Sequence, residues 1–377
     1  MYPRIQTAKD TVRVLVCPTA FKESLSASEA AAALRAGILQ AWPKAEVRVL
    51  PLSDGGPGLL ESVGTVGDEG EERVPTTGPF GEPITARILW TRPGEVVVEA
   101  AEACGLHLVP PRVRDPMLAD TGGVGIVLEH CCRSDARQVV LGLGGSATVD
   151  GGTGMARALG WQFLDADGRP LPPGGGVLMD LHRILPPEDV PASVTPDRGA
   201  PDTVALADVR SPLLGPQGAA RSFAAQKGAG PQEIELLEYG LTRLADVAAR
   251  DLGLDVRDIP GSGAAGGLGA GCLLFLGAEL IPGADWVLGR VGFDSELAAA
   301  DLLVTGEGAW DATSELGKIT EVVLARAAEA GVPSILLCGR IEGAVPVGVQ
   351  ALGGAGGSWL DADSISTLIA QHLGTDD

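Results

Sequence analysis

Short apolar segments that each end in a glycine-rich turn are the feature that most constrains the fold of this chain. Residues 12–17 have the short, β-branched character of a buried strand, and residues 46–52 predict a second strand. Between them, Ser26 and Glu29 have the spacing of a capping box, which predicts a helix that continues through residues 30–42. This β-α-β order predicts a parallel sheet with helical crossover connections.

The same rhythm returns near the C-terminus. Residues 301–305 predict a strand, 306–318 a long turn, 321–330 a helix and 332–338 another strand. The middle of the chain differs, because apolar and polar positions alternate over residues 70–100, as in strands of a half-exposed or mixed sheet. Further on, residues 165–203 are rich in Pro, Gly and Asp and predict loops, and residues 232–252 predict an amphipathic helix.

These patterns predict an α/β protein of two domains, which a chain of 377 residues is long enough to form. We expect a Rossmann-like parallel-sheet domain made of residues 1–70 and 285–377, with about 115–155 as a further candidate part. A second α/β domain with a mixed sheet, residues 71–284, would be inserted into it.

The charge of the chain restricts its partners. A formal net charge of −21 argues against nucleic acid or an anionic membrane, since both require a basic face. Only five of the 28 basic residues are Lys, and three of these, Lys22, Lys227 and Lys318, stand in glycine- or turn-rich segments where they could neutralise an anion.

Cysteine usage argues against a structural metal. Six Cys without a C-x-x-C pair, and four scattered His, make a zinc site improbable and free thiols the expectation. Because no apolar run of signal-peptide or membrane-span length is present, we expect a cytoplasmic protein.

Five stretches combine glycine with scarce polar side chains, most of them at strand ends. They are CPTAFKESLSA from residue 17, LSDGGPG from 52, LGLGGSATVDGGTGM from 141, the pair ADVRSPLLGPQGAARSFAAQKGA from 207 and PGSGAAGGLGAG from 260, and VTGEGAWDATSELGK from 304. In open α/β sheets, ligands bind beyond the carboxyl ends of strands, and glycines there let backbone N–H groups approach an anion. Carboxylates can hold Mg²⁺ or accept a hydroxyl proton, so the set favours phosphoryl transfer.

Other interpretations of these stretches remain open at this level. GLGGSA from residue 142 fits a loose dinucleotide-binding pattern, which would indicate an NAD-dependent dehydrogenase with Asp165 as its acidic residue, although Asp165 stands in a loop-like stretch. ELGKI lacks the leading Gly and the Ser or Thr of a P-loop. The glycines from residue 261 could serve close packing, and Asp54 and Asp150 could be turn residues.

Taken together and in order, the motifs resemble the bacterial glycerate kinases with two α/β domains. The matching segments are CP-x-x-FK-x-SLSA, DGG-x-G, GGSAT-x-DGG-x-G-M, DV-x-x-PLLGP-x-GA, QKGA, PG-x-GAAGGLGAG and TGEG-x-x-D-x-x-x-x-x-GK, from about residue 12 to 345. The resemblance implies ATP- and Mg²⁺-dependent phosphorylation of D-glycerate to 2- or 3-phosphoglycerate. It also implies a Rossmann-like domain with an inserted α/β domain and an active site in the cleft between them.

The resemblance implies candidate site residues at the matching positions. The catalytic candidates are Asp54, Asp208, Lys22 and Lys318. The substrate- or nucleotide-binding candidates are Ser24, Gly144, Gly145, Ser146, Asp150, Lys227, Gly263, Gly266, Glu307 and Asp311. Asp208 or Asp54 would orient or deprotonate the glycerate hydroxyl or hold Mg²⁺, the lysines would bind carboxylate and phosphates, and the metal ligands stay open.

The chain departs from the family pattern in its first loop, where residues 19–23 replace Asp-Ser-Phe-Lys-Gly, and at three positions further along. Thr19 stands where the family usually has Asp, Val149 replaces an Asn, Ala309 replaces an Arg and Thr313 replaces a Gln. The lost Arg matters most, since no neighbouring side chain offers its fork of donors. The alternative is therefore a diverged or catalytically silent member that acts on or binds another small hydroxy acid, with its oligomeric state open.

Overall fold

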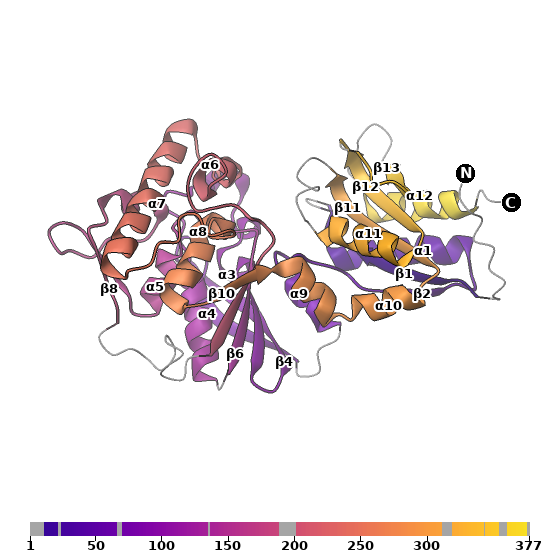
Figure 1. The fold of residues 1–377 in the computed structure, drawn as a ribbon, viewed down its shortest axis with the longest axis horizontal. Coiled ribbons are helices and arrows are strands. Elements are labelled where there is room, and N and C mark those ends of the chain that lie inside the picture. The colour runs from indigo at the N-terminus through magenta and orange to yellow at the C-terminus, as the bar shows by residue number, and fades with distance from the viewer. Residues whose placement is uncertain are drawn as a thin grey trace. The chain divides into compact units, whose positions relative to one another are not determined.

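The computed structural model describes residues 11–21, 24–65, 70–134, 136–187, 201–310, 319–342, 344–353 and 360–374. The chain divides into two compact units (Figure 1). Unit 1 comprises Met1–Asp54, Glu61–Val66 and Ala284–Asp377, and unit 2 comprises Gly55–Leu60 and Gly67–Gly283. Within the described ranges, every helix is too short or too polar to cross a membrane.

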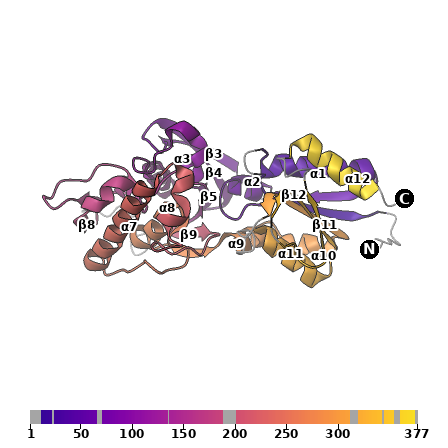
Figure 2. The ribbon, with the colours of Figure 1, turned by 90° about the horizontal axis from the view of Figure 1, so that it is seen from above.

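Unit 1 contains a five-stranded, all-parallel sheet with the strand order β13-β12-β11-β1-β2. Its strands are β1 (Arg13–Pro18), β2 (Glu46–Val49), β11 (Leu302–Trp310), β12 (Ser334–Ile341) and β13 (Val349–Gly353). Helices α1 (Ala27–Ala41) and α12 (Ala362–Gly374) lie on one face, and α10 (Phe293–Ala299) and α11 (Ile319–Ala330) lie on the other (Figure 2). The unit is therefore a three-layered α/β structure.

The start of α1 confirms the predicted capping box. The Ser26 hydroxyl accepts a hydrogen bond from the Glu29 N–H (3.2 Å), and the Glu29 carboxylate accepts one from the Ser26 N–H (2.8 Å). These bonds satisfy two amides that the helix itself leaves unpaired. The helix then buries Leu34 and Ile38 against the sheet and α12.

One strand boundary differs from the prediction. The sequence places a strand end at Thr305, but β11 continues to Trp310, with Glu307 paired to Cys338 and Trp310 to Ile341 of β12. The neighbouring strand supplies backbone partners for the glycine-rich residues, and the Trp310 side chain is buried, so pairing continues where local propensity predicts a turn.

Unit 2 contains a six-stranded mixed sheet with the strand order β10-β9-β6-β5-β4-β3. The strands are β3 (Gly70–Thr77), β4 (Pro83–Arg92), β5 (Glu95–Glu99), β6 (Gln138–Leu143), β9 (Asp202–Ala207) and β10 (Glu279–Pro282). The first three pair antiparallel, and β5, β6, β9 and β10 pair parallel. One all-parallel and one mixed sheet confirm the predicted α/β class.

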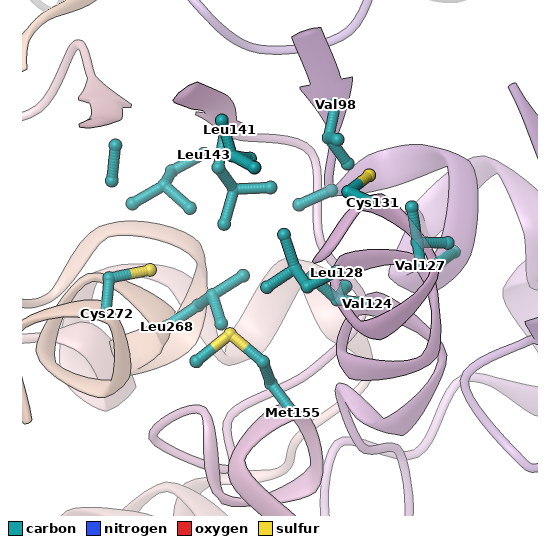
Figure 3. Close-up of a cluster of buried hydrophobic side chains, with 14 of the residues drawn as sticks. Val98, Val124, Val127, Leu128, Cys131, Leu141, Leu143, Met155, Leu268 and Cys272 are labelled. Carbon is teal, nitrogen blue, oxygen red and sulfur yellow. The ribbon is translucent and has the colours of Figure 1, made fainter. Parts of the chain in front are cut away.

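The helices of unit 2 build two cores beside this sheet. The helices of unit 2 are α3 (Ala101–Cys104), α4 (Gly122–Arg133), α5 (Thr153–Ala158), α6 (Ala219–Phe223), α7 (Pro231–Asp251) and α8 (Ala264–Gly271). Helix α2 (Leu59–Gly64) is divided between the two units, and α9 (Gly283–Arg290) belongs to unit 1 except for Gly283. In the first core, side chains of α4, α5 and α8 pack on β5 and β6 (Figure 3). The second core forms around α7, the predicted amphipathic helix.

The segment predicted as loops is more ordered than expected. Within residues 165–203 the chain forms a 3₁₀ segment, η3 (Gly175–Asp180), and strand β8 (Arg183–Leu185), which pairs with β7 (Gln162–Leu164). The η3 segment packs on α7, so tertiary contacts stabilise structure that its composition does not favour.

Close packing of α1 on α12 generates the first prediction. A Cβ at Gly37 would collide with the Ser366 carbonyl oxygen and the Ile369 side chain. We expect Gly37→Ala to lower the free energy of unfolding by about 1–3 kcal/mol despite the better helix propensity of Ala. Gly289→Ala in α9 is the control, because nothing lies within 4 Å of its Cβ position. Urea unfolding checks both, and equal stabilisation by the two changes would contradict the packing argument.

Candidate functional site

The sheet of unit 1 has a topological switch point between β1 and β11. From β1 the chain crosses through α1 to β2 on one side, and from β11 it crosses through α11 to β12 on the other. At such a point, the connections leave the carboxyl ends of neighbouring strands in opposite directions, and ligands of open α/β sheets bind there. We use the name switch edge for Thr19, which follows β1, Asp54, which lies in the segment after β2, and Glu307, which lies within β11.

Backbone pairing brings the segments of the switch edge together. The Thr19 N–H donates to the Gly306 carbonyl (2.9 Å), which places Thr19 beside the residue that precedes Glu307. The Leu52 N–H donates to the carbonyl of Pro18, the last residue of β1 (2.9 Å), and Asp54 stands two residues after Leu52. Asp54 is half-buried, and Glu307 is buried in β11. One position that departs from the family pattern, Thr19, thus lies at this edge.

Of the other predicted residues of unit 1, the structure describes Ser24, which stabilises a turn. Ser24 is exposed, and its hydroxyl donates to the Phe21 carbonyl (3.2 Å), which closes a turn before α1. Lys22, Asp311, Thr313 and Lys318 lie outside the described residues.

In unit 2, two glycine-rich segments meet at the carboxyl ends of β6 and β9. Leu143 pairs with Ala207, so Gly144 and Asp208 follow the last paired residues of neighbouring strands. A Cβ on Gly144 would lie 2.6 Å from the Gly56 Cα, and a Cβ on Gly145 would lie 2.5 Å from Pro57. The two segments therefore touch through the Gly56 backbone and the Pro57 ring.

We call residues 55–58, 144–146 and 208 the glycine edge. Gly145 has φ +62° and is exposed, and Asp208 is half-buried. An exposed glycine loop beside a carboxylate at the carboxyl ends of parallel strands can present backbone N–H groups to an anion, with an acidic group next to them.

The buried side chain of Lys227 binds the loop that follows β6. The side chain is buried, and its ammonium group donates to the Ser146 hydroxyl (2.9 Å) and to the Thr148 carbonyl (2.7 Å). Burial lowers the pKa of Lys227 to about 8, which the nearby Asp150 carboxylate partly opposes. The fold thus brings the predicted residues Ser146 and Lys227 together, and their polar groups form hydrogen bonds within the protein.

Asp150 organises the next turn. Its buried carboxylate accepts hydrogen bonds from the N–H (3.0 Å) and hydroxyl (2.8 Å) of Thr121 and from the N–H groups of Gly152 (3.2 Å) and Gly154 (3.0 Å). The neighbouring Asp120 has its pKa raised to about 6, first by burial and then by the Asp150 charge. Asp150 therefore ties the start of α5 to the segment before α4.

The glycines from residue 261 pack against this loop and against the segment that follows β9. A Cβ on Gly263 would collide with the Pro212 carbonyl, and one on Gly266, which has φ +71°, would collide with the Thr148 carbonyl. Both residues are buried. This geometry favours the packing interpretation of the glycine run. Val149, where the family pattern has Asn, belongs to the apolar core around α7.

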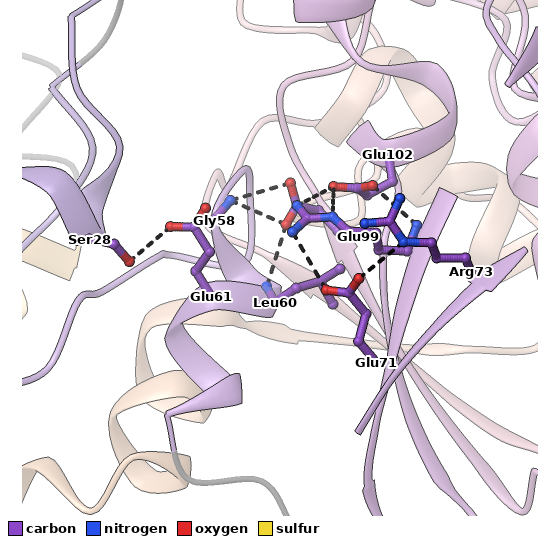
Figure 4. A network of polar contacts seen from close by, with 9 residues as sticks. Ser28, Gly58, Leu60, Glu61, Glu71, Arg73, Glu99 and Glu102 are labelled. Carbon is purple, nitrogen blue, oxygen red and sulfur yellow. Dashed lines mark hydrogen bonds and ion pairs between the residues drawn. The ribbon is translucent and has the colours of Figure 1, made fainter. Parts of the chain in front are cut away.

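Two residues of this region, Glu99 and Thr121, stand outside the glycine-rich motifs of the sequence. Glu99 ends the buried strand β5, and its carboxylate accepts hydrogen bonds from Gly58 and Leu60 (Figure 4). Burial, and secondarily Glu102, raise the pKa of Glu99 to about 7. In the sequence, the feature that could have indicated Glu99 is a charged residue directly after the apolar run of a predicted strand.

The dehydrogenase alternative is weakened. Asp165, the acid expected for a dehydrogenase, follows the small strand β7 and accepts hydrogen bonds from the N–H groups of Asp167 (2.9 Å) and Arg169 (2.8 Å), as a turn residue does. In the part of the chain that the structure describes, no three His, Cys, Asp or Glu side chains gather as a metal site.

Comparison with known proteins shows that this chain resembles kinases, and all the relatives described below are of one kinase family. The family model described as "Glycerate kinase family" matches residues 14–353. Glycerate kinase of Bacillus subtilis (strain 168) is 42% identical over 335 residues, 88% of this chain and 86% of the relative. Glycerate 2-kinase of Escherichia coli (strain K12) is 38% identical over 312 residues, 82% and 80% of the two chains.

A solved structure agrees with these relatives. A crystal structure from Salmonella typhimurium LT2, of a protein assigned as glycerate kinase 2, superposes with a TM-score of 0.78 at 34% identity. The alignment covers 97% of this chain and 98% of the other. The chain belongs to the glycerate kinase family. It is a phosphotransferase, and the family implies ATP and glycerate as substrates.

The Asp150 network generates a stability prediction. In Asp150→Asn the side-chain NH₂ group would face N–H and hydroxyl groups that are themselves hydrogen-bond donors. We therefore expect the free energy of unfolding to fall by about 2–3 kcal/mol. Asp165→Asn is the matched control, since an exposed turn accepts Asn readily. Urea unfolding compares the two variants, and an equal, small effect would show that the buried carboxylate is dispensable.

The depressed pKa of Lys227 predicts a pH dependence. Between pH 8 and the ordinary value of 10.5 the folded protein holds this proton less tightly than the unfolded chain does. Stability contributed by this group therefore rises with pH in that window, by up to about 3 kcal/mol. We expect the free energy of unfolding of the wild type to rise relative to Lys227→Met from pH 7.5 to 10. A pH-independent difference would contradict the prediction.

Proposed function

We propose that the protein transfers the γ-phosphoryl group of ATP to a hydroxyl of D-glycerate, with Mg²⁺, and releases ADP and phosphoglycerate. The observation that carries the proposal within the chain is the glycine edge, where two glycine-rich segments touch at the carboxyl ends of β6 and β9 beside Asp208. Exposed backbone at such an edge suits the phosphates of a nucleotide.

In the proposed reaction the glycerate hydroxyl oxygen forms a bond to the γ-phosphorus as the bond to the bridging oxygen of ADP breaks. Asp208 accepts the hydroxyl proton, and the N–H groups around Gly145 bind phosphate oxygens. Lys227, Ser146 and Asp150 serve this step by fixing the loop after β6, because their polar groups bond to the protein. Gly144, Gly263 and Gly266 serve it by allowing close backbone packing.

Mg²⁺ fits the donor set of the chain. This ion commonly binds one or two carboxylates together with waters and substrate phosphates, so a site without three clustered acidic side chains suits it. We propose Asp54 or Asp208 as such a ligand, with oxygen donors of the hard kind that Mg²⁺ prefers. When bound with ATP, the ion would neutralise charge on the phosphates.

The remaining candidates complete the proposal. Lys22 and Lys318 would neutralise the substrate carboxylate and the phosphates, and Ser24, Glu307 and Asp311 would bind substrate or nucleotide. We propose further that the two compact units are the two domains expected from the sequence. A reducing, cytoplasmic location is supported by six free cysteines, of which five are buried.

The test is ADP release by the purified protein with Mg-ATP, with and without D-glycerate. We expect turnover that depends on D-glycerate, and Asp208→Asn should lower kcat at least 100-fold, as loss of a general base does. Asp202→Asn is the matched control, because Asp202 is an exposed residue at the opposite end of the same strand. Full activity of Asp208→Asn would remove Asp208 from the mechanism.

Parallel substrates separate the alternatives. Thr19 lies at the switch edge where the family pattern has Asp, which favours testing other small hydroxy acids beside D-glycerate. Turnover with another acid alone would indicate a diverged specificity, and ATP binding without turnover would indicate a silent member. Coupling the product to enolase alone identifies 2-phosphoglycerate, because this enzyme does not act on the 3-phospho isomer.

A further inference from the structure

Glu99 is a buried carboxylate that the proposed mechanism does not use. It is the last residue of β5 and 4% exposed, and it pairs in register with Gly142 of β6. Its side chain therefore starts at the same end of the sheet as the glycine edge. Glu99 is buried too deeply to contact a ligand directly.

The carboxylate is directed at the loop that follows Asp54. The Gly58 N–H donates to both carboxylate oxygens (3.3 and 3.2 Å), and the Leu60 N–H makes a longer bond of 3.5 Å (Figure 4). These amides belong to the first turn of α2 and the residue before it, where a helix leaves its N–H groups unpaired. Glu99 thus binds a loop about 40 residues before it in the sequence.

The same loop packs on β6 and the turn after it. A Cβ on Gly142 would collide with the Gly55 carbonyl, and the Cβ positions of Gly144 and Gly145 would press on Gly56 and Pro57. The segment therefore meets β6 and its turn through the backbone of Gly55 and Gly56 and through the Pro57 ring. To this packing the Glu99 carboxylate adds a directional, charge-assisted hydrogen bond.

We propose that Glu99 is a positioning residue for phosphoryl transfer, which holds residues 55–58 against the carboxyl end of β6 and so fixes the shape of the glycine edge. This inference rests on the proposed function. The charged form is the better acceptor for the Gly58 amide, so the contact strengthens when Glu99 ionises.

The charged groups around Glu99 are few in the described part of the chain. Glu102 on α3 raises its pKa and Arg87 on β4 lowers it. Arg87 is itself paired with Glu102 (2.6 Å) and lies 3.8 Å from Glu71 on β3. On α2, Glu61 accepts a hydrogen bond from the Ser28 hydroxyl (3.1 Å). With burial as the largest cause, Glu99 has its pKa near 7 and titrates in the range where the enzyme is assayed.

The experiment compares the wild type with Glu99→Gln, which keeps the size of the side chain and removes the buried charge. We expect kcat/KM of the wild type to rise as pH passes through about 7, and this inflection to be absent from the variant. At pH 8 we expect kcat/KM of Glu99→Gln to be at least tenfold lower than that of the wild type. At pH 5.5, where Glu99 of the wild type is protonated, the two proteins should have the same urea midpoint.

Glu102→Gln is the matched control. It should keep the wild-type kcat/KM at high pH, because Glu102 does not bind the loop, and it should move the inflection to lower pH, because a charge that raises the pKa of Glu99 is gone. An inflection that stays in Glu99→Gln, or one that Glu102→Gln does not move, overturns the inference.

Hydrogen exchange separates this inference from the proposed function. The Gly58 and Leu60 amides should exchange at least tenfold faster in Glu99→Gln at pH 8 than in the wild type, whatever the substrate. Unchanged exchange overturns the positioning role. A wild type with no turnover on D-glycerate would refute the proposed function, while the exchange rates would still decide whether Glu99 holds the loop.

Discussion

Direct contact between backbones is the constraint on which the site depends. The segment from Gly55 to Gly58 lies on the end of β6 and the turn after it so closely that a single methyl group at Gly142 or Gly144 would not fit. The run from residue 261 lies on the loop after β6 in the same way, with Gly266 against the Thr148 carbonyl. Interiors packed to this density transmit small displacements, so the loop keeps one shape.

Backbone packed without side chains needs polar partners, because buried amide and carbonyl groups are costly when unpaired. Among the described residues of unit 2, three ionisable side chains near the glycine edge supply some of these partners. Lys227 donates to the Thr148 carbonyl, Asp150 accepts from Gly152 and Gly154, and Glu99 accepts from Gly58. Each of the three ties a glycine segment to a different element. If the loop binds an anion as we propose, these contacts hold it in place beforehand, which avoids reordering it during the reaction.

Local patterns were enough for much of the fold. The capping box at Ser26, the amphipathic helix α7 and the parallel and mixed character of the two sheets followed from periodicity and spacing. The extension of β11 through Trp310 did not, because its glycine-rich sequence pairs only when β12 is beside it. The role of Glu99 was equally hidden, since the amides that it binds lie about 40 residues away in the chain.

The sequence by itself determined the class of the protein: ordered glycine motifs at the ends of short strands resemble the glycerate kinases, and the comparisons confirm that family. Tertiary structure decided the burial and bonding partners of several motif residues. Lys227, a candidate anion ligand by composition, is buried and bonded to a loop, and Gly263 and Gly266 serve packing. A motif specifies which residues occur, but burial and partners come from segments distant in sequence, and these set the energy of every charge and hydrogen bond.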